Sequence, residues 1–213
     1  MASACELLRS VAQYPGPADD SRIDEILGLG AVPKSEGSIE IGRWKILGKG
    51  SRHTVIACDF RGTDAALKVL RSDAPRDNVF NEADMLLRAN SVGVGPKLFA
   101  FSEHSLVIER VYGTPLGNHE TLGDAGLVAC VRSALSQAAK LDEIGVDHGE
   151  LSRADWHVVF TGRKAKILDF DSAVAYRKCH NYNSLYSYAF RRRSRLCSRL
   201  AELHAAKGLP LPT

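Results

Sequence analysis

Most of the side chains that could do chemistry lie between residues 147 and 172. These side chains are His148, Glu150, Asp155, Asp169 and Asp171. The pattern predicts a strand over 156–160, a tight turn at 161–163, and a second strand that ends at Asp169. Carboxylates that converge from separate backbone segments bind hard divalent cations. The spacing therefore predicts a divalent-metal site at the mouth of a hairpin.

A glycine-containing turn, Gly48-Lys49-Gly50-Ser51, lies between predicted strands over 42–47 and 55–60. No helix follows this turn, and Gly50 stands where a Walker A motif needs Ser or Thr, so P-loop and Rossmann sites are excluded. The backbone N–H groups of such a turn can approach nucleotide phosphates. A purely structural hairpin explains this piece equally well.

A lysine interrupts the otherwise apolar strand predicted over 65–70. A buried Lys68 needs an anionic partner or an open cleft. Glu82 lies beside the apolar stripe of the next helix, which residues 72–75 are expected to open with a capping residue and a proline. Most helix glutamates are solvated. Pairing Glu82 with Lys68 would nevertheless satisfy both charges.

The remaining patterns divide the chain into three parts. Residues 1–40 hold two short amphipathic stretches, residues 41–112 are strand-rich, and residues 113–213 are mostly helical. A strong amphipathic helix is expected over 124–144, and a hinge near 109–113. Further strands are expected over 98–101 and 105–111. We therefore predict an α+β fold with a small antiparallel-sheet lobe and a reduced helical lobe.

Taken in order, these parts resemble a protein kinase over roughly residues 42–175. The order is glycine loop, strand lysine, helix glutamate, hinge, long helix, His-Gly-Glu-Leu and Asp-Phe-Asp. In detail the chain resembles the small atypical kinases of the RIO type and of the KEOPS complex, and compact archaeal serine/threonine kinases with a His-Gly-x-Leu-Ser loop. The resemblance implies a bilobal protein-kinase-like fold and an ATP- and Mg²⁺-dependent serine/threonine protein kinase.

The resemblance also implies a role for each motif residue. Lys68, oriented by Glu82, would neutralise the α- and β-phosphates of ATP. Asp169 and Asp155 would bind the magnesium ions. Glu150 would take the place of the proton acceptor, so the implied catalytic residues are Lys68, Glu150 and Asp169. The residues implied to contact ATP are Gly48, Lys49, Gly50, Ser51, Val55, Lys68, Glu82, Glu109 and Val111.

Several departures from the kinase pattern bear on activity. Glu150 replaces the usual Asp, and misplacing a reacting group by about 1 Å can cost on the order of a hundredfold in rate. Asp155 replaces Asn, His53 replaces the third glycine of the loop, and Asp171 replaces the glycine of Asp-Phe-Gly and could itself bind metal. No Ala-Pro-Glu motif follows Asp171. Two alternatives stay open: an ATP-binding pseudokinase or ATPase-type scaffold that contacts RNA or a protein, and a small-molecule kinase.

The basic character of the chain is concentrated at its end, since residues 174–213 hold eight Lys or Arg and one acidic residue. Apolar spacing there predicts a final helix with its arginines outward. A solvated basic face and an RNA or ribosome contact both fit this pattern. Five scattered cysteines favour reduced thiols over a disulfide framework. No apolar run is long enough to cross a membrane and no secretory signal is present, so we expect a cytoplasmic protein without a membrane partner.

Overall fold

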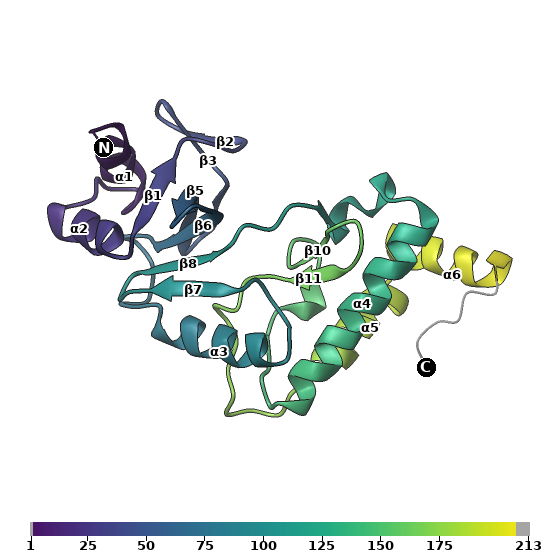
Figure 1. The fold of residues 1–213 in the computed structure, drawn as a ribbon. Helices are drawn as coiled ribbons and strands as arrows, with labels where there is room; N and C mark the ends of the chain where they lie inside the picture. Colours follow the sequence, from purple (N-terminus) through teal and green to yellow (C-terminus); the bar gives the residue numbers. More distant parts are fainter. Residues whose placement is uncertain (1, 208–213) are drawn as a thin grey trace. The chain divides into compact units, whose positions relative to one another are not determined.

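The computed structural model describes residues 2–207 and has an α+β fold with antiparallel sheets (Figure 1). Within these residues the chain forms two compact units. The first contains residues 2–84 and 97–110, and the second contains residues 85–96 and 111–207. The last passage from one unit to the other, between Arg110 and Val111, falls within the segment that the sequence predicts as a hinge.

The first unit is built on a six-stranded sheet in the order β1-β5-β6-β8-β7, with β4 paired to β5. The strands are β1 (Ala31–Lys34), β4 (Gly48–Lys49), β5 (His53–Phe60), β6 (Thr63–Leu70), β7 (Leu98–Phe101) and β8 (Ser105–Glu109). Arg61 and Gly62 join β5 to β6 with φ of 54° and 81°. Positive φ at both central residues matches the right-handed twist of the strands, so this turn forms a tight hairpin.

The chain before β5 differs in two respects from the sequence prediction. The single strand predicted over 42–47 is a separate hairpin of β2 (Ile39–Ile41) and β3 (Trp44–Ile46), because Gly42 turns the chain with φ of 58°. Strand β1 was not predicted, since Pro33 indicated a break. Proline is tolerated there because β1 is an edge strand that pairs only with β5 in this sheet.

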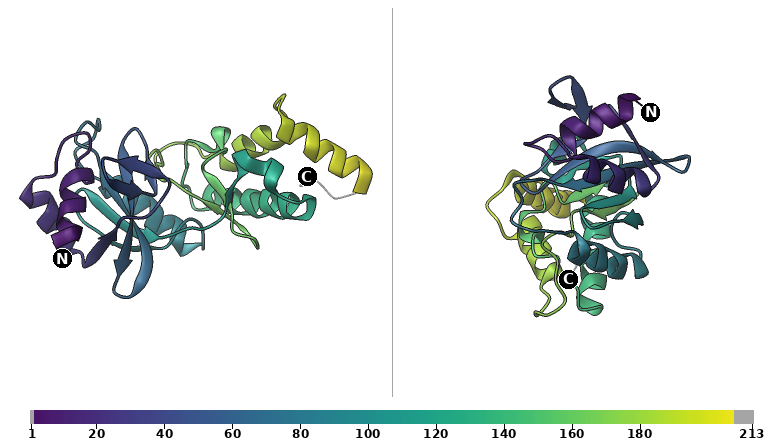
Figure 2. Two further views of the ribbon diagram at one scale, coloured as in Figure 1. Left: turned by 90° about the horizontal axis from the view of Figure 1, so that it is seen from above. Right: turned by 90° about the vertical axis from the view of Figure 1, so that its left-hand side faces the viewer.

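Helices α1 (Ala2–Val11) and α2 (Asp20–Gly28) pack on one face of this sheet, as the purple segments of Figure 2 show. Their apolar side chains share a core with alternate residues of β5 and β6. This core includes Leu7, Leu8, Val11, Ile23, Ile26, Ile56, Cys58, Ala65, Leu67 and Val69. Helices α1 and α2 therefore cover a face that the sheet cannot leave in water.

The alternation of β6 explains why its sequence is apolar on both faces. Residues two apart point to the same side of a strand. Leu67 and Val69 face the core shared with α1 and α2, whereas Leu70 packs against Val79 and Ala83 on the other face. Lys68 belongs to the same face as Leu70. The sheet therefore presents a single buried lysine on the side away from the N-terminal helices.

Helix α3 (Phe80–Ser91) begins later than the sequence predicts. The expected start at residues 72–75 is wrong, because Arg71 and Asp73 form two hydrogen bonds at 2.8 and 2.7 Å that hold a turn there. The Val79 N–H donates to the Glu103 carbonyl at 2.9 Å, and the Asn78 side chain accepts from the Phe80 N–H. Asn78 is thus the residue that supports the first turn of the helix.

The second unit combines helices with a three-stranded sheet in the order β11-β10-β9. Its elements are β9 (Thr114–Pro115), the 3-10 helix η1 (Leu116–Thr121), α4 (Asp124–Glu143), the 3-10 helix η2 (Leu151–Arg153), β10 (Val158–Phe160), β11 (Ala165–Ile167), α5 (Asn181–Phe190) and α6 (Arg195–Lys207). Helices α4 and α5 lie side by side (Figure 1). The predicted amphipathic helix over 124–144 is confirmed to within a residue.

The final helix predicted from the sequence is two helices in the structure. The Ser194 hydroxyl oxygen accepts a hydrogen bond from the Cys197 N–H at 3.2 Å, so Ser194 starts α6 after a break at residues 191–194. The predicted apolar positions are nevertheless all buried. They are Leu185, Ala189, Leu196, Leu200 and Leu203.

The cysteines of the described residues form no disulfide bond. All five cysteines are free, and burial raises the pKa of the Cys58 and Cys130 thiols to about 12. Such thiols stay protonated and unreactive.

Within residues 2–207, no helix combines the length and the apolar character that crossing a bilayer requires.

Candidate functional site

Lys68 and Glu82 form a buried ion pair in the first unit. The Lys68 Nζ donates to the Glu82 Oε1 at 2.6 Å, and the side chains are 8% and 4% exposed. Glu82 lies in the first turn of α3, and the packing of Val79 and Ala83 against Leu70 brings that turn onto the sheet face that carries Lys68. The pair expected from the sequence is therefore present.

His53 and Val55 share this sheet face with Lys68. In the register of β5 and β6, Val55 lies opposite Lys68 and His53 lies opposite Leu70. Residues that are directly opposite in an antiparallel pair project to the same side. The His53 Nε2 is 3.6 Å from the Glu82 Oε2. The histidine that replaces a loop glycine of the kinase pattern is therefore a buried neighbour of the Lys68–Glu82 pair.

The glycine hairpin is formed by β4 and the start of β5, as expected. The Gly50 N–H donates to the His53 carbonyl at 2.9 Å, and the Arg71 guanidinium donates to the Gly50 carbonyl at 2.7 Å. The Lys49 ammonium lies 4.8 Å from the centre of the Tyr14 ring. Residues 49–51 are exposed. The turn is thus braced from behind by Arg71 and Tyr14 while its own residues face solvent.

The two hinge residues expected to contact ATP fall on either side of the passage between the units. Glu109 is the last residue of β8, and its N–H donates to the Lys97 carbonyl at 2.8 Å. Its side chain accepts from the Lys97 N–H at 3.1 Å. Val111 is the first residue of the second unit's longer segment. A role for Glu109 and Val111 in nucleotide binding stays a prediction.

In the second unit, α4 holds the β10–β11 hairpin in place. The Gln137 side chain donates to the Ala165 carbonyl at 2.7 Å, and the Ser133 hydroxyl accepts from the Ala165 N–H at 3.0 Å. The turn is closed by a bond from the Thr161 N–H to the Lys164 carbonyl at 3.0 Å. Since Ala165 is the first residue of β11, these bonds fix the strand that leads to Asp169.

Asp169 has a left-handed backbone conformation, with φ of 69°. For a residue other than glycine this conformation costs on the order of 1–2 kcal/mol, although Asp tolerates it better than most. The side chain is partly buried, and the following Phe170 is fully buried. Backbone strain that the surrounding packing enforces is a feature of functional sites. The strain turns the chain directly after the hairpin, where the sequence predicts metal binding.

Glu150, His157 and Asp169 converge in the second unit. Each offers one ligand atom, and these atoms lie within 4.8 Å of one another. The His157 Nε2 is 3.0 Å from the Glu150 Oε2, and the Ser172 hydroxyl donates to the Glu150 Oε1 at 3.1 Å. The structure thus brings together two predicted site residues, Glu150 and Asp169, and adds a histidine.

His157 was not predicted as a site residue, because the sequence pattern places it in a strand over 156–160. In the structure β10 starts at Val158, and the Val158 N–H donates to the Ala154 carbonyl at 3.1 Å. Trp156 and His157 therefore lie in a turn. The sequence does offer one signal for His157. It is a histidine two residues after Asp155, in a run that is otherwise apolar as far as Phe160.

Asp155, predicted as a metal ligand, contacts a different element. Its Oδ1 accepts a hydrogen bond from the Tyr188 hydroxyl of α5 at 2.7 Å. Burial and this bond raise the pKa of Tyr188. Among the described residues, Asp155 is not part of the Glu150, His157 and Asp169 group. A metal-binding role for Asp155 stays a prediction.

We expect Tyr188→Phe to destabilise the protein by about 1–3 kcal/mol, because the variant removes a hydrogen bond to a carboxylate from a buried position. Tyr186→Phe, on the same helix, is the matched control and should change stability by less than about 0.5 kcal/mol. Urea unfolding followed by circular dichroism gives both values. Equal stability of the two variants would show that the Asp155 bond contributes nothing.

His148 supports the loop between α4 and η2. Its ring is fully buried, its Nε2 is 3.0 Å from the Leu168 carbonyl oxygen, and its centre is 5.0 Å from that of the Phe170 ring. Burial lowers the pKa of His148 to about 4, so the ring is neutral at pH 7.

Gly149 turns the chain with φ of 84°, and a Cβ added at this residue would lie 3.0 Å from the Ser172 carbonyl oxygen. Asp171 is buried.

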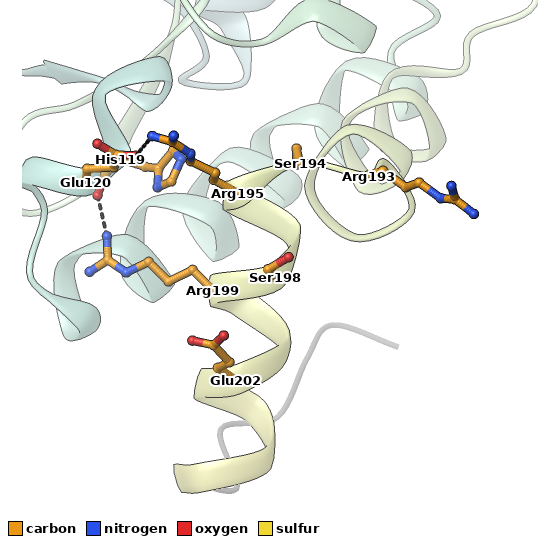
Figure 3. Close-up of a pocket in the computed structure, with 8 residues that line it drawn as sticks. All are labelled: His119, Glu120, Arg193, Ser194, Arg195, Ser198, Arg199 and Glu202. Atoms are coloured by element: carbon orange, nitrogen blue, oxygen red, sulfur yellow. Dashed lines mark hydrogen bonds and ion pairs between the residues drawn. The ribbon is translucent and has the colours of Figure 1, made fainter.

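The arginines of the tail have two different environments (Figure 3). Arg191, Arg192 and Arg193 are exposed. Arg199, predicted to point outward, is instead 24% exposed and donates to the carbonyls of His119 and Leu122 at 2.5 and 2.6 Å. Arg199 therefore ties α6 to the end of η1. Binding of RNA or a ribosome by the remaining arginines stays a prediction.

A comparison of the sequence with protein-family models and with curated proteins gives no match. The kinase resemblance therefore depends on the motifs and their order, and the functional assignment depends on the two clusters described above.

Proposed function

We propose that the chain is an ATP- and Mg²⁺-dependent phosphotransferase with a bilobal protein-kinase-like arrangement, and that its acceptor is a serine or threonine of a protein. The observation that carries this proposal is the Lys68–Glu82 pair, with its 2.6 Å bond and nearly complete burial. We further propose a cytoplasmic location.

The energetics of the pair support a functional role. Removing two charges from water costs several kcal/mol per ion, and a buried ion pair is often no more stabilising than apolar residues of similar volume. Every neighbouring position on that strand, from Ala65 to Leu70, is apolar and buried. A lysine there is therefore poorly explained by stability. It is well explained by a need for a positive charge that Glu82 holds in one position.

The residues present fit ATP with a divalent ion. Lys68 supplies a positive charge for the phosphates, and the turn at residues 49–51 is exposed, so that its backbone is open to them. Asp169 and Glu150 supply the carboxylate oxygens that magnesium prefers. Bound magnesium would neutralise the charge of the β- and γ-phosphates.

The test is transfer of label from [γ-³²P]ATP in the presence of Mg²⁺, to the protein itself or to generic protein acceptors. We expect labelled phosphoserine or phosphothreonine that disappears when EDTA is added. Release of labelled inorganic phosphate alone, with no labelled protein, would contradict the proposed acceptor. The absence of both would contradict phosphotransfer.

A specific observation favours a second function, a nucleotide-binding scaffold with little transfer. Both carboxylate oxygens of Glu150 are engaged, one by Ser172 at 3.1 Å and one by His157 at 3.0 Å. A carboxylate held in this way is poorly placed to accept a proton from a substrate. If the scaffold function is correct, Mg-ATP raises the unfolding temperature of the wild type without transfer. Transfer by Glu150→Asp alone would then identify Glu150 as the residue that blocks it.

A further inference from the structure

The Glu150, His157 and Asp169 group has a donor set unlike the oxygen-only set that the kinase resemblance implies. It combines two carboxylates with one imidazole, and the three ligand atoms lie within 4.8 Å of one another. Mg²⁺ prefers oxygen ligands, whereas imidazole suits Zn²⁺, Fe²⁺, Cu²⁺ and Ni²⁺. Three protein ligands also leave coordination positions open for water or a substrate.

The three ligands come from three separate segments, and each is positioned by other contacts. Glu150 precedes η2, His157 lies in the turn before β10, and Asp169 follows β11. The Leu168 N–H donates to the His157 carbonyl at 2.8 Å, so the backbones that carry His157 and Asp169 are directly linked. The Ser172 hydroxyl orients the Glu150 carboxylate. Such outer contacts support metal ligands in known sites.

The burial of the group also suits a bound ion. The side chains of Glu150 and His157 are both 18% exposed, so they are partly removed from water but accessible to a small ion. The ring of His157 meets that of the buried His148 edge to face, with 5.8 Å between the ring centres. This contact fixes the plane of the His157 imidazole on one side while its Nε2 faces Glu150.

We infer that Glu150, His157 and Asp169 form a binding site for a divalent transition-metal ion. The site lies within the second unit and needs no nucleotide, so the inference does not depend on phosphotransfer. In this site Glu150 is a metal ligand, and the 3.0 Å contact between His157 and Glu150 is replaced by a shared bond to the ion. The imidazole favours a first-row transition-metal ion over Mg²⁺, and Mn²⁺ serves as a paramagnetic probe of such a site.

The test is a titration of the nucleotide-free 213-residue chain with Mn²⁺, followed by the loss of the electron paramagnetic resonance signal of free Mn²⁺. We expect one saturable site that millimolar Mg²⁺ displaces poorly. His157→Gln should weaken binding at least tenfold, and Glu150→Gln and Asp169→Asn should do the same. The control is His180→Gln, which changes an exposed histidine of the same unit and should bind Mn²⁺ as the wild type does.

A second measurement detects the bound ion through a tryptophan beside the site. Trp156 is 66% exposed and adjoins His157, and the only other tryptophan is Trp44 in the first unit. In a Trp44→Phe protein, Mn²⁺ should quench the Trp156 fluorescence over the same concentration range. Pulsed paramagnetic resonance of the bound Mn²⁺ should show ¹⁴N coupling from a coordinated imidazole, which His157→Gln removes.

Three results would overturn the inference. They are the absence of saturable Mn²⁺ binding, unchanged binding in a folded His157→Gln protein, and a bound ion without ¹⁴N coupling. The last two would identify an oxygen-only site. Because ATP is absent from these experiments, their failure leaves phosphotransfer from labelled ATP as a separate question.

Discussion

Asp169→Asn is expected to lower phosphotransfer by at least about a hundredfold, since it removes a negative charge from the position where the proposed metal and phosphates would meet. The change is nearly isosteric, and asparagine also tolerates the left-handed backbone that Asp169 adopts at φ of 69°. Loss of activity should therefore occur without loss of the fold. Initial rates of label transfer from [γ-³²P]ATP, measured at saturating Mg²⁺, give the result.

The matched control for Asp169→Asn is Glu120→Gln. Glu120 is an exposed carboxylate of the same unit whose side chain is 62% exposed and pairs with Arg195 at 3.0 Å. This variant removes the same charge from a residue outside the Glu150, His157 and Asp169 group, and exposed pairs contribute little to stability. It should transfer phosphate at the wild-type rate. Equal activity of Asp169→Asn and Glu120→Gln would remove Asp169 from the reaction.

The second large effect is on stability. We expect Lys68→Met to lower the free energy of unfolding by about 3–5 kcal/mol, because it leaves the Glu82 carboxylate buried without its cation. Glu82→Leu should cost a similar amount for the converse reason. The two side chains are only 8% and 4% exposed, so removing either partner leaves the other charge buried and strongly lowers stability. Urea unfolding at pH 7 measures both changes.

The double variant Lys68→Met, Glu82→Leu completes this cycle. It replaces the ion pair by apolar side chains of similar volume, an exchange that is often neutral or stabilising. We therefore expect it to recover most of the lost stability. If its cost instead equals the sum of the two single costs, the two side chains are energetically independent and the ion pair does not hold the lysine.

The elements that position the site were largely predictable from local pattern. Alternation, turn residues and apolar spacing locate the strands around Lys68, the glycine hairpin and α4. The Lys68–Glu82 pair was predictable because a charge in an apolar strand needs a partner. The role of residues 1–40 was not, because only the folded sheet shows which face remains for α1 and α2 to cover.

The composition of the proposed metal site was predictable only in part. Asp169 was predictable because an acidic residue at the end of a predicted strand is a typical ligand position. The place of His157, in contrast, depends on where β10 begins. A shift of two residues in that start decides whether the imidazole lies in a strand or beside Glu150. The binding of Asp155 to Tyr188 depends on the packing of α5, which lies far along the sequence. Local patterns do not encode such contacts.

The most direct test of whether Lys68 supports phosphotransfer compares two rates of label transfer from [γ-³²P]ATP. They are the rate of the double variant Lys68→Met, Glu82→Leu and the rate of the wild type. If Lys68 serves the phosphates of ATP, the wild type transfers label, and the double variant, shown to be folded by circular dichroism, loses at least about a hundredfold in rate. Transfer by the folded double variant at the wild-type rate would contradict the claim that this lysine supports phosphotransfer.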